Sequence, residues 1–244
     1  MRNRLVALLA AAASLGAAQA AFAADLPVKA PPPAAVVAAN WSGCYVGGQV
    51  GYGWVRDKLV ETIVATGALS PLTPSDTAHP SGLKAGGLVG CNWQWSGAFV
   101  VGVEGDGEWA DIGGSTVVYP LTLGDTYQTR IRWQASARGR VGYALDRTLV
   151  YVTGGAAFAN IRHEYTLAAA GLSERFTTNR VGWTVGAGVE HAFQPNWTAR
   201  VEYRYADFGH VTNIPTIFGS AFRERHTITE HVVRGALAYK FTGF

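Results

Sequence analysis

The sequence predicts an all-β fold, an eight-stranded antiparallel transmembrane up-and-down β-barrel, and three observations support this prediction. The 244 residues include 30 Gly, 8 Trp, 10 Tyr and 10 Phe but only 15% charged residues. That composition suits a membrane barrel, with glycines at close strand contacts and aromatic residues at the interfaces. Apolar and polar residues alternate in repeated segments, as strands with two different faces require. No run of about 20 apolar residues follows the N-terminal region, so no spanning helix is expected.

The first residues predict export. Residues 1–23 have the features of a secretory signal peptide: Arg2 and Arg4, an apolar run at 5–18, and the small-x-small cleavage site 21–23. A membrane anchor is the alternative, but the run is short and rich in alanine. Cleavage removes both arginines, so the formal charge of +3 becomes about +1 in the mature chain. Because no run of Lys or Arg remains, nucleic acid is not expected as a partner.

Residues 24–40 predict a Pro/Ala-rich periplasmic linker. This segment carries three successive prolines at 31–33, followed mainly by alanine and valine. Proline at this density fits neither a helix nor a sheet, so a flexible tether is expected. The remaining residues, 41–244, are enough for one barrel domain.

Period-two alternation marks the strands. Between residues 197 and 205, Trp197, Val201 and Tyr205 share one face, while Arg200 and Glu202 share the other. A soluble antiparallel sheet also alternates, but the signal peptide, the even strand count and the aromatic ends of the apolar faces favour a membrane barrel. The expected strands are 44–54, 83–93, 99–109, 129–143, 148–161, 180–193, 198–208 and 227–241.

The connections between these segments alternate in length. Residues 95–98, 144–147 and 194–197 are short turns with suitable turn residues. Longer links lie near 55–82, 110–128, 162–179 and 209–226. Short periplasmic turns and four long extracellular loops are therefore expected.

The alternation assigns a set of charged residues to the inner face, with six acids and eight bases. An eight-stranded barrel is wide enough only for side chains or one small ligand, and charges inside it must be paired or hydrated. A salt-bridged, structural lumen is favoured over an ion-conducting or ligand-gating one. The set is Glu104, Asp106, Glu108, Arg130, Arg132, Arg138, Arg140, Glu190, Arg200, Glu202, Arg204, Glu230, Arg234 and Lys240.

The two cysteines predict a disulfide. Cys44 begins the first strand and Cys91 lies near the end of the second, so both fall near the periplasmic rim on the outward face. An exported chain meets an oxidising compartment, and a cross-strand disulfide is expected; two free thiols are the alternative. Further zinc ligands near the cysteines are not evident in the sequence.

No catalytic, cofactor-binding or metal-binding residue is expected. Acids such as Asp106 and Glu108 stand two residues apart simply because they share a strand face, and Glu230 and His231 lie on opposite faces. An outer-membrane lipid hydrolase or acyltransferase would need a Ser or Asp, a His and an acid at the same height on the barrel wall. Four histidines fall in expected loops or loop edges, where solvation is the ordinary role and capture of haem or metal the alternative: His79, His163, His210 and His226.

Four stretches resemble a known family. They are residues 24–32 after the signal peptide, residues 41–54, residues 86–94, and the ending Arg234–Phe241. Together they are similar to the small outer-membrane immunogenic, or porin-family, surface antigens of α-proteobacteria. The ending also resembles the signal read by the barrel-assembly machinery, with Tyr239 and Phe241. Because the chain continues to Phe244, either Phe241 or Phe244 could make that contact.

The resemblance implies a structural outer-membrane barrel that supports envelope integrity and presents surface loops. The alternatives are a narrow porin or a haemin-binding surface receptor, and a lipid-modifying enzyme ranks below both. The expected location is the outer membrane, reached through the general secretory pathway. Expected partners are outer-membrane lipids, lipopolysaccharide and the assembly machinery. A barrel closes without a partner, so a monomer is expected.

Overall fold

The computed structural model describes residues 39–71, 75–95, 97–114, 116–118, 124–218 and 220–241, with no description of side chains at 116–118 and 218. The signal peptide, all but the end of the linker, and Phe244 of the expected assembly signal therefore lie outside the described residues. No helix among the described residues is long and apolar enough to cross a membrane.

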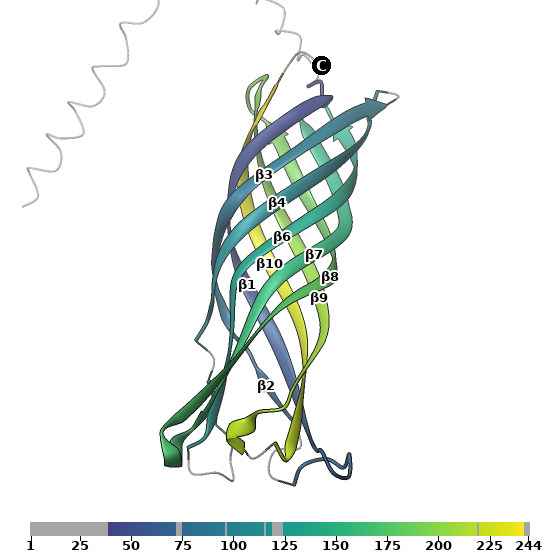
Figure 1. Ribbon diagram of the computed structural model, residues 1–244. Coiled ribbons are helices and arrows are strands. Elements are labelled where there is room, and N and C mark those ends of the chain that lie inside the picture. The colour runs from purple at the N-terminus through teal and green to yellow at the C-terminus, as the bar shows by residue number, and fades with distance from the viewer. Residues whose placement is uncertain are drawn as a thin grey trace, which may run out of the picture. The chain divides into compact units, whose positions relative to one another are not determined.

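Among the described residues, eight long strands form the wall, each antiparallel to its neighbours, and β10 pairs back onto β1 to close the barrel (Figure 1). The register of the closing pair runs from Tyr45 opposite Lys240 to Ile63 opposite Phe222. The eight-stranded barrel expected from the sequence is confirmed. The long strands are β1 (Gly43–Ile63), β3 (Ser81–Trp95), β4 (Phe99–Gly113), β6 (Thr126–Leu145), β7 (Thr148–Leu167), β8 (Leu172–Ala192), β9 (Trp197–Asn213) and β10 (Phe222–Lys240).

Four short elements complete the described part of the domain. Strand β2 (Ser75–Ala78) pairs with β1, and β5 (Thr116–Val118) pairs with β6. The 3-10 turns are η1 (Ala168–Ala170) and η2 (Thr216–Phe218). All four lie at the end of the barrel opposite the short strand connections (Figure 1).

The strands are longer than the sequence suggested, and this corrects the expected loops. Strands β7 and β8 stay paired as far as Leu167 and Leu172, so the link expected at 162–179 shrinks to η1 and Gly171. Gly171 has φ 62°, a left-handed conformation that glycine adopts without strain. The expectation failed because polar residues such as Arg162 and Glu164 replace the apolar residues on the outer face there, which removes the hydrophobic pattern while pairing continues.

The outer face is apolar between two belts of aromatic residues. On β4 the outward residues run from Phe99 through Val101 and Val103 to Trp109, which is 82% exposed. Beyond Trp54 on β1, the next outward residue is the exposed Arg56. Such a continuous exposed apolar band needs lipid rather than water around it. The strands thus cross the membrane in this band and continue beyond it as a polar extension.

An irregularity in β6 reverses its alternation. The register between β6 and β7 shifts between Ile131 and Trp133, so Arg132 has no single partner. On one side of this β-bulge Ile131 is buried, and on the other Trp133 is exposed and Gln134 buried. A bulge adds one residue to one strand and so changes which parity faces inward.

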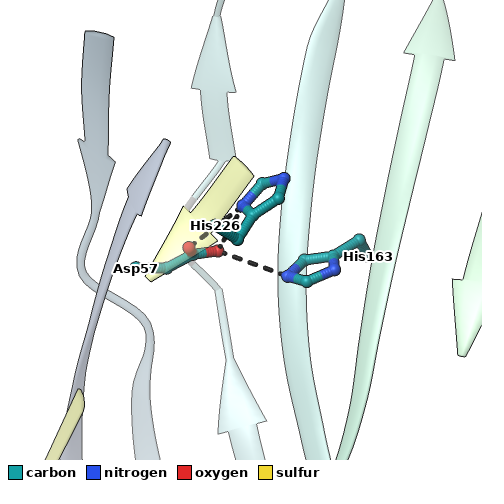
Figure 2. Close-up of side chains that lie close together, drawn as sticks. All are labelled: Asp57, His163 and His226. Atoms are coloured by element: carbon teal, nitrogen blue, oxygen red, sulfur yellow. Dashed lines mark hydrogen bonds and ion pairs between the residues drawn. The ribbon is translucent and has the colours of Figure 1, made fainter. Parts of the chain in front are cut away.

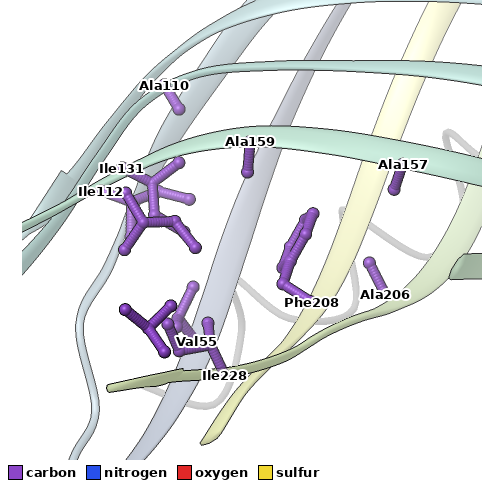
Figure 3. Packing of buried hydrophobic residues seen from close by; sticks show 11 residues of the cluster. Val55, Ala110, Ile112, Ile131, Ala157, Ala159, Ala206, Phe208 and Ile228 are labelled. Atoms are coloured by element: carbon purple, nitrogen blue, oxygen red, sulfur yellow. The ribbon is translucent and has the colours of Figure 1, made fainter. Parts of the chain in front are cut away.

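Inward side chains change character along the barrel. On β1 they are, in order, Tyr45, Gln49, Val55, Asp57 and Leu59, all buried. Residues from other strands join each level, so polar and apolar layers alternate. Figure 3 shows one apolar layer, in which buried side chains of several strands point toward one another. This layer includes Val55, Ile112, Ile131, Phe208 and Ile228.

Candidate functional site: the filled interior

A network of buried ion pairs fills the part of the interior surrounded by the apolar band. Glu104 on β4 accepts hydrogen bonds from Arg138 and Arg200, and the Tyr45 hydroxyl donates to it over 2.8 Å. Glu202 on β9 accepts from Arg138 over 2.7 Å and from Arg234 over 2.6 Å. These side chains come from strands far apart in the sheet, so the network ties opposite walls together.

Glu108 and Asp106 extend the same network. Glu108 lies 2.9 Å from Nζ of Lys84, 3.0 Å from Arg204 and 3.3 Å from Arg234. Asp106 accepts from Arg138 over 3.0 Å and pairs with Arg204 over 3.3 Å. A buried ion costs several kcal/mol of desolvation, which only well-placed partners offset. The multiple contacts of each carboxylate supply those partners.

Six acids and six bases make up this network among the described residues. Eleven of them belong to the set assigned from alternation, and Lys84 is the one that sequence reasoning missed. Lys84 stands between the outward Leu83 and Ala85, so the parity rule applied to that strand would have found it. The network consists of Glu104, Asp106, Glu108, Glu190, Glu202, Glu230, Lys84, Arg138, Arg140, Arg200, Arg204 and Arg234.

Three residues assigned to the inner face lie elsewhere. Arg130 and Arg132 are exposed on the outer wall, because the bulge at Arg132 turns both of them away from the lumen. That prediction is wrong for both. Lys240 is half-buried at the rim beside the short turns, where its ammonium donates to the carbonyl of Asn40.

The cysteines and the end of β10 are on the outer wall. Cys44 and Cys91 are register partners on β1 and β3, and a disulfide joins them. Tyr239 and Phe241, two residues of the expected assembly signal, are exposed near the same rim.

A second polar layer lies in the extension, beyond the apolar band. Asp57 of β1, His163 of β7 and His226 of β10 converge there, each no more than 1% exposed (Figure 2). Nδ1 of His226 lies 3.0 Å from Oδ1 of Asp57, and Nε2 of His163 lies 3.5 Å from Oδ2. The expectation that these two histidines occupy loops is wrong, since both lie on strands with their rings inside.

Burial and charge act in opposite directions on these groups. Burial favours the neutral form of Asp57, but the neighbouring His226 and His163 outweigh it and hold the pKa of this carboxyl below its usual value. Burial also opposes a charge on His226, yet Asp57 and Glu224 raise its pKa to about 9. Burial and the nearby His226 lower the pKa of His163. The layer therefore holds one imidazole that favours a proton and one that resists it.

The other histidines do not join this layer. His79 and His210 are exposed, and Gly209, with φ 68°, marks the point where β9 reverses its alternation and turns His210 outward. His231 is exposed on β10, where its Nδ1 lies 2.6 Å from the Tyr203 hydroxyl.

Closed antiparallel strands, an apolar outer band between aromatic belts and a charged interior together define an outer-membrane β-barrel protein. The chain belongs to the family described as outer membrane protein beta-barrel domain, whose model matches residues 7–241. The protein is therefore located in the outer membrane, in contact with its lipids.

Curated relatives come from α-proteobacteria. The 31 kDa outer-membrane immunogenic protein of Brucella melitensis is 33% identical, with 91% of this chain and 93% of the relative covered. The 25 kDa outer-membrane immunogenic protein of Brucella abortus is 32% identical, with coverage of 99% and 100%. Among solved structures, the outer membrane protein OprG of Pseudomonas aeruginosa aligns with a TM-score of 0.47 and 10% identity over 84% of this chain and 99% of that one. Similarity at that level supports no conclusion about function.

Proposed function

We propose that this protein is a structural barrel of the outer membrane, with a closed lumen, that supports the envelope and presents its polar extension at the cell surface. The observation that carries the proposal is the buried network of six acids and six bases among the described residues. Paired charges that link opposite walls stiffen a barrel, whereas a conducting pore needs hydrated charges along a continuous path. The apolar layer around Phe208 and Ile228 adds a second obstruction.

Planar-bilayer recording tests this proposal. The purified, folded protein should give no reproducible conductance steps, because ions would have to cross both the ion-pair network and the apolar layer. Regular steps from the unmodified protein would favour the porin alternative. The double variant Ile228→Ala with Phe208→Ala should be recorded beside the unmodified protein. It removes side-chain volume from the apolar layer and leaves the ion-pair network unchanged.

The haemin-receptor alternative has less support than the surface-antigen role. Two of the four histidines considered for ligand capture, His163 and His226, are buried and closed off. His79 and His210 are exposed, and replacing both with glutamine tests them. An absorbance shift on haemin titration that disappears in this variant would favour the receptor.

The outer wall offers a site for lipopolysaccharide. Arg130, Arg132 and Arg162 line a cavity of about 530 Å³ beside the exposed Trp109, and Asp111 is the one carboxylate on its lining. Tryptophan belts mark the level of lipid headgroups, and arginine forms bidentate hydrogen bonds with phosphate. We infer that these arginines bind the phosphates of the outer leaflet, with the extension facing outside and the short turns facing the periplasm.

A binding comparison tests this contact. The double variant Arg130→Gln with Arg162→Gln should bind lipopolysaccharide more weakly than the unmodified barrel. Arg147→Gln is the matched control, because Arg147 is exposed in the turn at the opposite end. Equal loss in both variants would show only a general charge effect.

The N-terminal residues have roles in export and tethering under this proposal. Residues 1–23 would be removed during export through the general secretory pathway, and residues 24–40 would tether the barrel in the periplasm. Tyr239 is exposed on the last strand and Phe241 directly after it, which supports their recognition by the assembly machinery. The closed β1–β10 seam supports a monomer. The carboxylates of the network are held by arginines, which supports a structural rather than an enzymatic role.

A further inference from the structure

Asp57, His163 and His226 bring one carboxylate and two imidazoles together from strands far apart in the sequence. Strands β1 and β10 are neighbours, whereas β7 lies across the lumen from them. One possible ligand atom from each residue lies within 4.8 Å of those of the other two. Figure 2 shows the His163 and His226 rings, which are stacked with their centroids 4.1 Å apart, both directed at the same carboxylate.

We propose that these three residues form a binding site for a divalent transition-metal ion of the zinc class. Two ligand atoms on one tetrahedral zinc ion stand about 3.3 Å apart, since each bond is about 2.0 Å long. Oδ2 of Asp57 lies 3.1 Å from Nδ1 of His226 and 3.5 Å from Nε2 of His163, and these two distances bracket that separation. Imidazole nitrogen and carboxylate oxygen are ligands that zinc accepts.

The surrounding residues orient the rings as outer partners of metal ligands do. Nε2 of His226, the atom turned away from Asp57, lies 2.8 Å from the Tyr165 hydroxyl and 3.6 Å from Glu224. Nδ1 of His163 lies 3.2 Å from Nδ2 of the Asn213 carboxamide, and exchanging the oxygen and nitrogen of this amide would place Oδ1 there. A ligating histidine usually donates its second N–H to such a partner, which fixes the ring and its tautomer. Ligation through Nε2 leaves the proton of His163 on Nδ1, so Asn213 must present its carboxamide oxygen there.

One of the three possible ligand atoms lacks a hydrogen bond. Nε2 of His163 is buried and makes no hydrogen bond within the described residues. Asp57 and Glu224 are both fully buried beside the two imidazoles, so this layer gathers several groups that can bind a cation. A divalent cation bound there would give Nε2 of His163 the partner that it lacks.

Apolar layers on both sides make the site dry and selective. Val55, Ile161 and Ile228 lie toward the membrane, and Leu59, Tyr127 and Tyr165 lie toward the outer end. Hydrated ions such as Mg²⁺ keep several waters and prefer oxygen ligands. A buried layer with two imidazole ligands between apolar layers therefore favours zinc over magnesium.

Because the ligands are buried, the metal should enter as the barrel folds. Tag-free protein would be refolded in detergent with Zn²⁺ or with chelator, and bound metal would be measured after dialysis. The unmodified protein should retain one Zn²⁺ per chain and none after refolding with chelator. Refolding with Co²⁺ should give the visible absorption of a tetrahedral site, which surface histidines do not produce.

Matched variants locate the ion. His163→Gln and His226→Gln should each abolish the retained metal, while His210→Gln, which changes an exposed histidine of the same extension, should leave it unchanged. Glu224→Gln should weaken binding by about 10–100-fold, the usual effect of losing an outer partner. Gel mobility before and after boiling would verify that each variant is folded.

Two outcomes would overturn the proposal. One is unmodified, folded protein that retains no Zn²⁺ and gives no Co²⁺ spectrum, which would leave Asp57 and His226 as a metal-free ion pair. The other is metal that is retained equally in a folded His163→Gln variant, which would assign it to the exposed histidines.

Discussion

Arg138 on β6 and Glu202 on β9 form an ion pair of 2.7 Å across the interior, although strands β7 and β8 lie between β6 and β9 in the sheet. The same carboxylate oxygen accepts a hydrogen bond from Arg234 on β10. A single glutamate thus connects three strands through the lumen. This arrangement explains how a barrel with so polar an interior can hold its shape within a membrane.

Neutralising Glu202 should destabilise the barrel strongly. Glu202→Gln leaves Arg138 and Arg234 without this carboxylate inside a low-dielectric interior, at a cost of about 3–5 kcal/mol. The measurement is urea-induced unfolding in lipid vesicles. Glu164→Gln is the control, because the Glu164–Arg175 pair lies on the outer face of the extension and is partly exposed. It should cost less than about 1 kcal/mol, and equal effects of the two changes would contradict the network's role.

The free-energy cost of placing a charge on the outer face should depend on how deep in the membrane the position lies. Val103→Arg places a cation on the lipid face midway between Phe99 and Trp109 and should cost about 2–4 kcal/mol. Thr227→Arg places the same charge on the exposed face of the β10 extension and should cost at most about 1 kcal/mol. Unfolding of both variants in the same vesicles provides the comparison. A cheaper change at Val103 than at Thr227 would contradict the assignment of the band.

The Cys44–Cys91 disulfide should contribute measurable stability. Its loss in the Cys44→Ser, Cys91→Ser variant is expected to lower the free energy of unfolding by about 2–4 kcal/mol, mainly by releasing the unfolded chain. Mass spectrometry after alkylation, with and without reductant, reports the bond. Free thiols in native protein isolated from the envelope would show that the bond does not form there.

Alternation along the strands was enough to predict the barrel, most of the ion-pair network and the cysteine pair. The alternation pattern misplaced Arg130 and Arg132. A one-residue bulge changes which alternate residues of the strand face inward, and no simple sequence pattern predicts such a bulge. The alternation also misplaced His163 and His226. Their strands continue past the membrane, where the outer face turns polar and the hydrophobic signal of a strand disappears. The Asp57 cluster could not be foreseen, since it depends on the register between three distant strands.

Thiol accessibility measures whether the interior of the barrel is closed to water. In the Cys44→Ser, Cys91→Ser background, Ser136→Cys places a thiol inside the network, where Ser136 is 5% exposed and bonded to Asp106. Ser173→Cys places one on exposed β8 as a control. A water-soluble maleimide should label Ser173→Cys rapidly, and Ser136→Cys only after unfolding. Comparable labelling of both positions in the folded barrel would contradict the closed interior.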